Sequence, residues 1–397
     1  MTVCNEIADY EWLTGREADA LLGELAADTL PLHTAVSRLR RRLTQNRTHL
    51  LIEQVELRRR AAAKFTQAHR MFFTRIGLEQ ATDDRVACYK AARFASAGWI
   101  GKAGGIVDLC CGIGGDLAAL AGITPAIGID REGVTAHFAS ANTGTAVHAL
   151  DVKDFDLSSA AAFHMDPDRR PTGRRTTSIE TCEPNRVAIE RLLQQVPNAA
   201  IKLAPATEVP IDWQERCELE WISRGRECRQ LVAWHGELAR GSGKCSATIL
   251  SAARRFVPRT IAGEPKQPVH IVEKPDRYVF DVDPAVLAAK LNGALAAEHQ
   301  LDALGDGPTY FTGPSAIDDP ALSCFQVDEV VPFQLTILAK HLSARRIGQL
   351  EIKKRNIDVD PEKLRCQLKL RGSNNATLLI TRVAGRPTAI LSRRLTD

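Results

Sequence analysis

The chain has 397 residues, of which 44% are hydrophobic and 25% are charged, and its formal net charge is +4. This composition supports a globular protein with a sizeable core and excludes a uniformly polycationic chain. No run approaches the roughly 18 apolar residues of a transmembrane helix, and the acidic N-terminal sequence lacks the order of a secretory signal. We therefore expect a cytoplasmic protein that has no membrane partner.

Residues 17–70 are predicted to be helical, because their leucines recur at the spacing of one helix face. Residues 105–235 alternate short apolar runs with helical stretches. The runs are GIVDL, AIGID, VHALD, AAFHMD and AAIKLAP. This alternation is typical of a parallel sheet with crossover helices. Residues 218–236 contain two alternating strands around Ser-Arg-Gly-Arg, which predicts a final antiparallel hairpin.

The C-terminal half is predicted to hold one helix and one separate basic unit. The alanine- and leucine-rich run at 284–301 predicts a single helix. Residues 341–397 predict a strand, a helix that opens near Asp360-Pro361, and two last strands. They carry 13 Lys and Arg against 5 Asp and Glu, a net charge of +8. This excess indicates a contact with nucleic acid. A basic domain with no such partner is the alternative.

The stretch IVDLCCGIGGD, at 106–116, places glycines directly after a strand. Glycines permit a sharp turn and let a nucleotide approach the backbone, and the helix that follows presents unpaired N–H groups. Both dinucleotides and S-adenosylmethionine use such a turn. Leu117 stands where a dinucleotide fingerprint needs its third glycine. Asp108 would repel a pyrophosphate but suits the cationic amino-acid end of S-adenosylmethionine.

Acidic residues follow four successive predicted strands. They are Asp108, Asp130, Asp151 and Asp166. Each alone fits a helix N-cap, but together they indicate a site at the carboxyl edge of the sheet. Asp130 lies 18 residues beyond Gly112, where an acid can bind ribose hydroxyls. The ten cysteines have irregular spacing and form no CxxC pair, so we expect reduced thiols and no metal site.

These motifs resemble those of a known family. DLCCGIGGD, with GID and MDPDRR downstream, resembles class I S-adenosylmethionine-dependent methyltransferases. FFTRIGLEQATDDRVACYKAARF (72–94) is similar to the segment that closes over the methionine end of the cofactor in RNA methyltransferases of this type. The basic C-terminal sequence resembles the THUMP-like domain of a bacterial family with this layout. The resemblance covers about residues 50–397.

The resemblance implies a fold class and a domain order. The fold class is α/β, with a doubly wound Rossmann-like methyltransferase sheet. The expected domains are an N-terminal helical region (1–95), the S-adenosylmethionine-binding domain (96–250), a connecting region (251–335) and a small α+β THUMP-like domain (336–397).

The resemblance also implies which residues hold S-adenosylmethionine as cofactor. The expected binding residues are Asp108, Cys110, Gly112, Gly114, Asp130, Asp151, Gln80 and Thr82. Among them, Asp130 is expected at the ribose and Asp151 at the adenine, while Cys110 packs beside the methionine moiety. Gln80 and Thr82 are expected at the methionine carboxylate or amine. Their alternative role is to cap the helix that follows.

The end of the fourth strand is where the sequence departs from the family pattern. Amino-methylating members have Asn/Asp-Pro-Pro-aromatic there, whereas this chain has Asp166-Pro167-Asp168-Arg169. We expect Asp166, with Pro167, to orient the methyl acceptor, and Arg169 to stack on a base or bind a phosphate. The expected substrate contacts are Arg170, Arg174, Arg175, Lys353, Lys354 and Arg355. The alternative for the arginines is a solvated loop.

The leading interpretation is an S-adenosylmethionine-dependent methyltransferase that methylates an RNA base, with tRNA or rRNA as partner. A small-molecule or protein methyltransferase on the same fold is one alternative. A non-catalytic RNA-binding protein that retains the fold is another. A cysteine nucleophile for C5-pyrimidine methylation would have to be Cys182 or Cys217, and no motif marks either residue.

Overall fold

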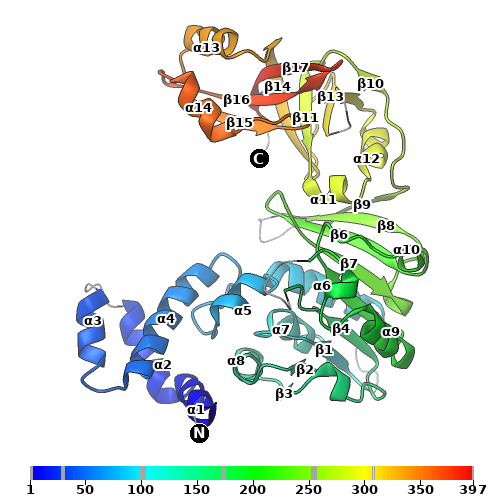
Figure 1. The fold of residues 1–397 in the computed structure, drawn as a ribbon. Helices are drawn as coiled ribbons and strands as arrows, with labels where there is room; N and C mark the ends of the chain where they lie inside the picture. The colour runs from blue at the N-terminus through cyan, green and yellow to red at the C-terminus, as the bar shows by residue number, and fades with distance from the viewer. Residues whose placement is uncertain are drawn as a thin grey trace. The chain divides into compact units, whose positions relative to one another are not determined.

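The computed structural model in Figure 1 describes residues 3–27, 32–98, 104–170, 176–251, 257–305, 307 and 309–395. The chain divides into two units. Unit 1 comprises residues 1–217 and 232–242, and unit 2 comprises residues 218–231 and 243–397. No helix among the described residues combines the length and the apolar composition that crossing a bilayer requires.

The described part of unit 1 before Ala61 is mainly helical, as predicted, with a turn at residues 40–44. Residues 62–70 form turns instead, so the prediction is wrong for this segment. Leu39, Leu50 and Leu51 are buried in one apolar cluster, which also receives Phe138. The helices are α1 (Val3–Leu13), α2 (Arg16–Ala27), α3 (Leu32–Leu39), α4 (Gln45–Ala61), α5 (Arg75–Gln80) and α6 (Asp84–Ser96).

A nine-stranded sheet, counted over the described residues, has the order β3-β2-β1-β4-β5-β7-β6-β8-β9. Strands β1 to β5 are parallel. The strands β1, β4 and β5 are buried along their whole length, which is why they appear as short apolar runs. The strands are β1 (Ile106–Leu109), β2 (Ala126–Asp130), β3 (Val147–Ala149), β4 (Ala162–Met165), β5 (Ala199–Leu203), β6 (Glu218–Arg224), β7 (Glu227–His235), β8 (Cys245–Leu250) and β9 (Arg259–Gly263).

The doubly wound prediction is therefore confirmed, and the predicted hairpin is present as β6 and β7, with its turn at Gly225 and Arg226. The prediction that this hairpin ends the sheet is wrong, because β8 pairs with β6 and β9 pairs with β8. The chain runs outward from β1 to β3 and then returns to β4 beside β1. Ligands of such sheets bind at the carboxyl ends of the strands on either side of this switch. The crossover elements are α7 (Gly115–Ala121), α8 (Gly133–Thr143), α9 (Arg186–Gln195), α10 (Ile211–Arg216) and the 3-10 helices η1 (Val152–Asp154), η2 (Ile179–Thr181) and η3 (Gly236–Leu238).

Unit 2 contains an eight-stranded sheet of described residues, with the order β10-β12-β13-β11-β14-β17-β16-β15. The predicted strand, helix and two final strands are present, and Asp360 caps the helix by accepting two amide hydrogen bonds. The elements are β10 (Ile271–Val272), β11 (Tyr278–Val282), β12 (Asp302–Leu304), β13 (Tyr310–Gly313), β14 (Leu322–Pro332), α13 (Leu335–Ala344), β15 (Ile347–Lys354), α14 (Pro361–Leu368), β16 (Asn374–Val383) and β17 (Arg386–Arg394). Residue 336, the expected domain limit, lies inside α13, and β17 pairs with β14.

The single helix predicted over 284–301 is wrong. The structure has α11 (Pro284–Ala288) and α12 (Asn292–His299), separated by Lys290 with a left-handed φ of 58°. The break exposes the Lys290 carbonyl, which accepts a hydrogen bond from the Lys266 amide at 2.8 Å. A Cβ on Gly293 would lie 2.1 Å from the Gln267 carbonyl oxygen. Tertiary packing of residues 266–267 therefore overrides the helical propensity of the run.

We expect Gly293→Ala to lower the free energy of unfolding by about 1–3 kcal/mol, because the added methyl group collides with backbone. Gly23→Ala in α2 is the matched control, since a Cβ there would meet no atom within 4 Å. It should stabilise the protein by about 0.5–1 kcal/mol through helix propensity. Urea denaturation of both variants measures this difference. A neutral Gly293→Ala would contradict the packing argument.

Candidate active site

The loop between β1 and α7 leaves its backbone open on one side. Cys110, Gly112 and Gly114 have left-handed φ angles of 56°, 55° and 85°. A Cβ at Gly112 would meet no atom within 4 Å, whereas one at Gly114 would lie 2.7 Å from the Thr143 methyl carbon. Gly112 therefore borders open space, and Gly114 is required by packing as well as by φ. A ligand can approach the backbone closely at such a loop.

Cys110 has an environment that suits packing. The φ angle of Cys110, 56°, lies in the left-handed region, which residues other than glycine rarely adopt. Burial, with the carboxylate of Asp130 nearby, raises the pKa of the Cys110 thiol well above its usual value. The thiol therefore stays protonated, and a protonated thiol is a poor nucleophile.

Asp130, at the end of β2, is bound directly to the glycine loop. Its Oδ2 accepts a hydrogen bond from the Gly112 amide at 2.9 Å, and its Oδ1 accepts one from the Glu132 amide at 3.0 Å. Burial raises the pKa of this carboxyl, and the two amides oppose the rise. The contact places a half-buried carboxylate beside the open face of Gly112.

Asp108 lies within β1 and is only 1% exposed. It stands in register with His164 of β4, and its Oδ1 lies 2.7 Å from His164 Nδ1. Its Oδ2 is buried and has no hydrogen-bond partner among the described atoms. Burial raises the pKa of Asp108, and the charge of His164 opposes this effect. One oxygen of the Asp108 carboxyl group therefore contacts His164 of the neighbouring strand, and the other has no described hydrogen-bond partner.

A buried lysine continues this network into the helices. Lys90 of α6 is 1% exposed, and its Nζ lies 2.9 Å from His164 Nε2 and 2.7 Å from Asp116 Oδ1 of α7. Burial lowers the pKa of Lys90. Burial opposes ionisation of Asp116, but the charges of Lys90 and His164 outweigh it and hold the pKa of that carboxyl well below its usual range. The network ties α6, α7 and two central strands together.

The segment before α6 lies against the glycine loop. The Thr82 carbonyl oxygen lies 2.9 Å from where a Cβ on Gly115 would be, and Thr82 Oγ1 is buried with no hydrogen-bond partner among the described atoms. The Gln80 carbonyl accepts a hydrogen bond from Lys202 Nζ at 3.2 Å. Asp83 is the N-cap of α6, so neither Gln80 nor Thr82 has the capping role that we considered for them.

Asp166 follows β4 at the carboxyl edge of the sheet. Its amide donates to the Leu109 carbonyl at 3.2 Å, which joins it to the end of β1. Its Oδ2 lies 2.5 Å from Lys202 Nζ, while 25% of its side chain is exposed. Pro167 is buried and Arg169 is half-buried. The structure therefore brings an accessible carboxylate close to the end of the strand that carries the glycine loop.

The residues after Asp166 are held by ion pairs and by a β-bridge. Asp168 forms an isolated bridge with Glu183, and Arg131 Nη1 lies 2.8 Å from the Glu183 carboxylate. Arg170 lies 2.7 Å from Glu79 of α5. The segment that follows β4 is thereby attached to the segment before α6. Arg174 and Arg175 lie outside the described residues.

Asp151 has a local structural role. It caps η1, where its Oδ1 accepts a hydrogen bond from the Lys153 amide at 3.0 Å. Its second oxygen lies 3.7 Å from Lys153 Nζ. The residue follows β3, which is at the edge of the sheet, so it still belongs to the carboxyl edge.

Two of the three basic residues predicted in unit 2 contact one buried carboxylate. Asp281 is 2% exposed, and it binds Arg355 at 2.8 Å, Lys353 at 3.0 Å and Arg226 at 3.2 Å. Burial opposes its ionisation, but these cations hold the pKa of Asp281 below its usual value. Lys354 is exposed. Two of the three predicted cations are thus partly neutralised, and Lys354 faces solvent.

Neither candidate cysteine has the environment of a nucleophile. Cys182 is buried, and burial raises the pKa of its thiol. Cys217 is fully buried, with its Sγ 2.8 Å from the Trp213 carbonyl oxygen. Neither thiol is therefore set up for attack on a pyrimidine.

Sequence reasoning missed Lys90, His164, Asp116 and Lys202. One signal was available for His164 and Lys202: each is a polar residue inside an otherwise apolar strand, AFHM and AAIKL. A polar side chain in a strand that is buried on both faces needs a partner. No such signal marks Lys90, because a lysine on a helix is ordinarily exposed.

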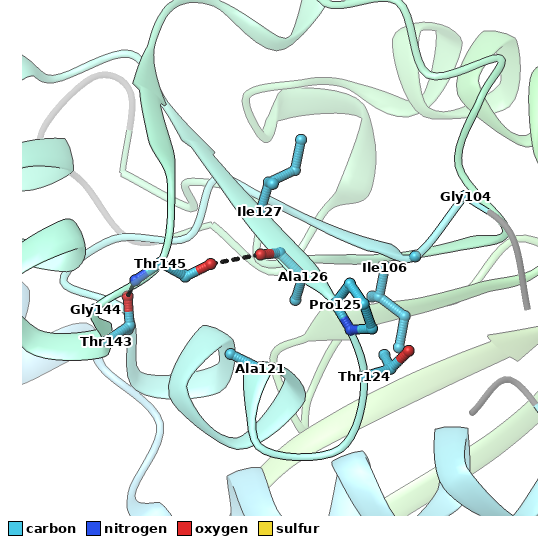
Figure 2. A pocket seen from close by; sticks show the side chains of 11 residues that line it. Gly104, Ile106, Ala121, Thr124, Pro125, Ala126, Ile127, Thr143, Gly144 and Thr145 are labelled. Carbon is cyan, nitrogen blue, oxygen red and sulfur yellow. Dashed lines mark hydrogen bonds between the residues drawn. The ribbon is translucent and has the colours of Figure 1, made fainter. Parts of the chain in front are cut away.

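Unit 1 also has a cavity of about 670 Å³ at the opposite end of the strands. Figure 2 shows it at the start of β1 and β2, where Thr145 Oγ1 donates to the Ala126 carbonyl at 2.6 Å. Its described lining comprises Gly104, Gly105, Ile106, Ala121, Thr124, Pro125, Ala126, Ile127, Thr143, Gly144 and Thr145. None of these side chains is titratable in the range that acid–base chemistry needs, so we assign the cavity no part in catalysis.

Comparison with known proteins identifies the class. Two strains of Mycobacterium tuberculosis, CDC 1551 and H37Rv, have relatives described as S-adenosylmethionine-dependent methyltransferases (MT3122 and Rv3037c). Each is 30% identical over 358 residues, which covers 85% of this chain and 94% of the relative. The chain therefore belongs to the S-adenosylmethionine-dependent methyltransferases. It is an enzyme of this class, and S-adenosylmethionine is its cofactor.

Two further similarities concern the fold. A crystal structure from Porphyromonas gingivalis W83, described as that of a methyltransferase, has a TM-score of 0.73 and 21% identity, with 99% of each chain covered. Residues 322–394 match the family model described as THUMP domain-like. The predicted methyltransferase fold and the THUMP-like C-terminal domain are confirmed.

We expect Asp130→Ala to weaken the binding of S-adenosylmethionine at least tenfold, or about 1.4 kcal/mol. The substitution removes a carboxylate beside the open loop and releases the Gly112 amide. Isothermal titration calorimetry measures the affinity. Asp156→Ala is the matched control, because Asp156 is exposed and its hydrogen bonds to described residues come from the nearby Ser158. Equal affinities of the two variants would contradict the role of Asp130.

We expect Lys90→Met to lower the free energy of unfolding at pH 7 by about 3–5 kcal/mol, because Asp116 would keep a buried charge without its cation. The double variant Lys90→Met/Asp116→Asn removes both charges and should recover part of the loss. Urea denaturation followed by intrinsic fluorescence measures all three proteins. If the double variant is no more stable than the single one, the ion pair is not the cause.

Proposed function

We propose that this methyltransferase transfers the methyl group to a base of structured RNA, with tRNA or rRNA as the substrate class. The supporting observation is that the THUMP-like match at 322–394 falls in the part of the chain where positive charge is concentrated. Residues 341–397 carry the net charge of +8, which favours phosphate contacts. Such a domain docks RNA through shape and phosphates, and it does not read sequence strongly by itself.

The residues at the carboxyl edge fit S-adenosylmethionine. Asp108 Oδ2 and Thr82 Oγ1 are buried oxygen atoms without described partners, and both suit the cationic amine of the methionine end. Gly112 and Gly114, with Cys110, would form the floor beneath it. We assign Asp130 to the ribose hydroxyls, Asp151 to the adenine and Gln80 to the methionine carboxylate side. The cofactor supplies an activated methyl group on a sulfonium.

Besides binding the cofactor, the site must place the methyl acceptor of the substrate. A bound sulfonium is already electrophilic, so alignment of the two reacting atoms supplies most of the rate. Asp166 has an accessible carboxylate that accepts a hydrogen bond from the acceptor, and the buried Pro167 fixes the backbone there. Arg169 and Arg170 would contact base or phosphate beside it. Arg174 and Arg175 extend this basic stretch in the sequence.

Unit 2 would contribute the phosphate contacts. Lys354 is exposed and is the simplest candidate for a phosphate. Lys353 and Arg355 share Asp281, yet each keeps between 24% and 29% of its side chain exposed. They would strengthen the positive potential more than they would bind a phosphate directly.

We expect the purified enzyme to transfer a radiolabelled methyl group from S-adenosylmethionine to total RNA of a deletion strain. RNA of the parent strain, which is already modified, should accept little label. Asp166→Ala should lose at least about 99% of the activity, since a misplaced acceptor costs roughly 10²-fold. Transfer should fall steeply as salt rises, because each neutralised phosphate releases counterions.

Two outcomes would contradict the proposal. Label in a small molecule or in protein, without steep salt dependence, would favour the corresponding alternative methyltransferase. Cofactor binding without label in either RNA, and with no loss of cellular modification in Asp166→Ala, would favour a non-catalytic RNA-binding protein.

A further inference from the structure

Lys202 is a buried cation that none of the expected roles uses. It lies in β5, where only 6% of the residue is exposed. The strand is buried on both faces, so an ammonium in it costs free energy unless its hydrogen bonds are made. Two of its three N–H groups have described partners, which are Asp166 Oδ2 at 2.5 Å and the Gln80 carbonyl at 3.2 Å. Both partners belong to the expected active site.

We propose that Lys202 is a positioning residue, which fixes Asp166 as a hydrogen-bond acceptor for a methyl acceptor that carries an N–H or O–H group. This inference rests on the proposed function. The ion pair occupies Asp166 Oδ2 and holds the carboxylate in one orientation. Within the described residues, Oδ1 accepts no hydrogen bond, and the side chain is 25% exposed. Oδ1 is therefore the oxygen that faces the substrate.

Two lysines and two cysteine thiols lie near the Asp166 carboxyl group. Asp166 faces Lys202 from β5 and Lys90 from α6, and the Cys110 and Cys182 thiols lie near it. Burial raises the pKa of both thiols, so neither adds a negative charge at neutral pH. Of these four groups, the two lysines are therefore the charged partners of Asp166. An ionised carboxylate offers acceptors and no donor.

The ion pair between Asp166 and Lys202 limits which acceptor atoms the site can bind. A carboxylate oxygen repels the lone pair of a pyridine-type ring nitrogen, but it binds an amino, lactam or hydroxyl hydrogen. During transfer the acceptor atom bonds to the methyl carbon, the sulfur–carbon bond breaks with its electron pair on sulfur, and the acceptor proton passes to Asp166 Oδ1. Methylation at carbon 5 would need a thiolate, and neither Cys182 nor Cys217 supplies one.

Lys202 also connects Asp166 to the segment that precedes α6. The Gln80 carbonyl ends α5, and the same segment places Thr82 against the glycine loop. Loss of the ammonium would therefore loosen the acceptor carboxylate and one side of the cofactor site. If the loss of Lys202 lowers kcat more than it lowers the affinity for S-adenosylmethionine, the main effect is on the acceptor carboxylate and not on the cofactor site.

The test is a double-mutant cycle with RNA as acceptor. We expect Lys202→Met to lower kcat by about 10²-fold, with the KM for RNA nearly unchanged. Lys202→Arg should restore part of the rate. Because Lys202 acts through Asp166, the double variant Lys202→Met/Asp166→Ala should be no slower than Asp166→Ala alone. Losses that multiply would overturn the proposal. Lys274→Met, at an exposed lysine, is the control and should match the wild type.

Two further measurements keep this result separate from the proposed function. The Asp166 carboxyl 13C signal, assigned by its absence in Asp166→Asn, should move in Lys202→Met and stay in place in Lys274→Met. This readout needs no RNA, and an unmoved signal would overturn the positioning role.

Digestion of the labelled RNA then identifies the methylated atom. An amino, lactam or hydroxyl product supports the inference, and a methylated pyridine-type nitrogen or carbon overturns it. An inactive wild type would overturn only the proposed function and the acceptor chemistry that depends on it.

Discussion

The buried ion pair between Lys90 and Asp116 is the constraint on which the site depends. An ammonium that is 1% exposed persists only because Asp116 and His164 lie within hydrogen-bond distance. His164 in turn binds Asp108, so the network joins α6, α7, β4 and β1. These elements carry the segment before α6, the glycine loop and the end of β4. Their relative positions are therefore fixed by charge as well as by apolar packing.

The edge of the sheet separates two kinds of carboxylate. Asp108 and Asp116 are buried and belong to the network, whereas Asp130 and Asp166 keep exposed surface and face the open side. Both oxygens of Asp130 accept hydrogen bonds from backbone amides, those of Gly112 and Glu132, and Asp166 Oδ2 pairs with Lys202. A carboxylate held by such contacts is oriented before a ligand arrives, which reduces the entropy lost on binding.

In unit 2 a buried carboxylate orients cations, whereas in unit 1 backbone amides or a cation orient each carboxylate. The buried Asp281 gathers Arg226, Lys353 and Arg355, so that one carboxylate orients three cations. The surface that results is more ordered than a row of free lysines, and it has less net charge than the sequence suggests. The excess of basic residues in the sequence is real, but the number available for phosphates depends on such pairing.

The sequence by itself determined the parallel sheet and the glycine loop, because strand periodicity, glycine spacing and strand-end acids are local signals. The resemblance of these motifs to a known family indicated the methyltransferase class. It also located Asp130 and Asp166 at strand ends, where parallel topology places them on one edge. Only the tertiary structure decided that Asp108 binds His164, that Lys90 is buried, that Lys202 holds Asp166 and that residues 284–301 break at Lys290. Each of these depends on a partner far away in sequence, and the spacing of residues along the chain carries no information about such a partner.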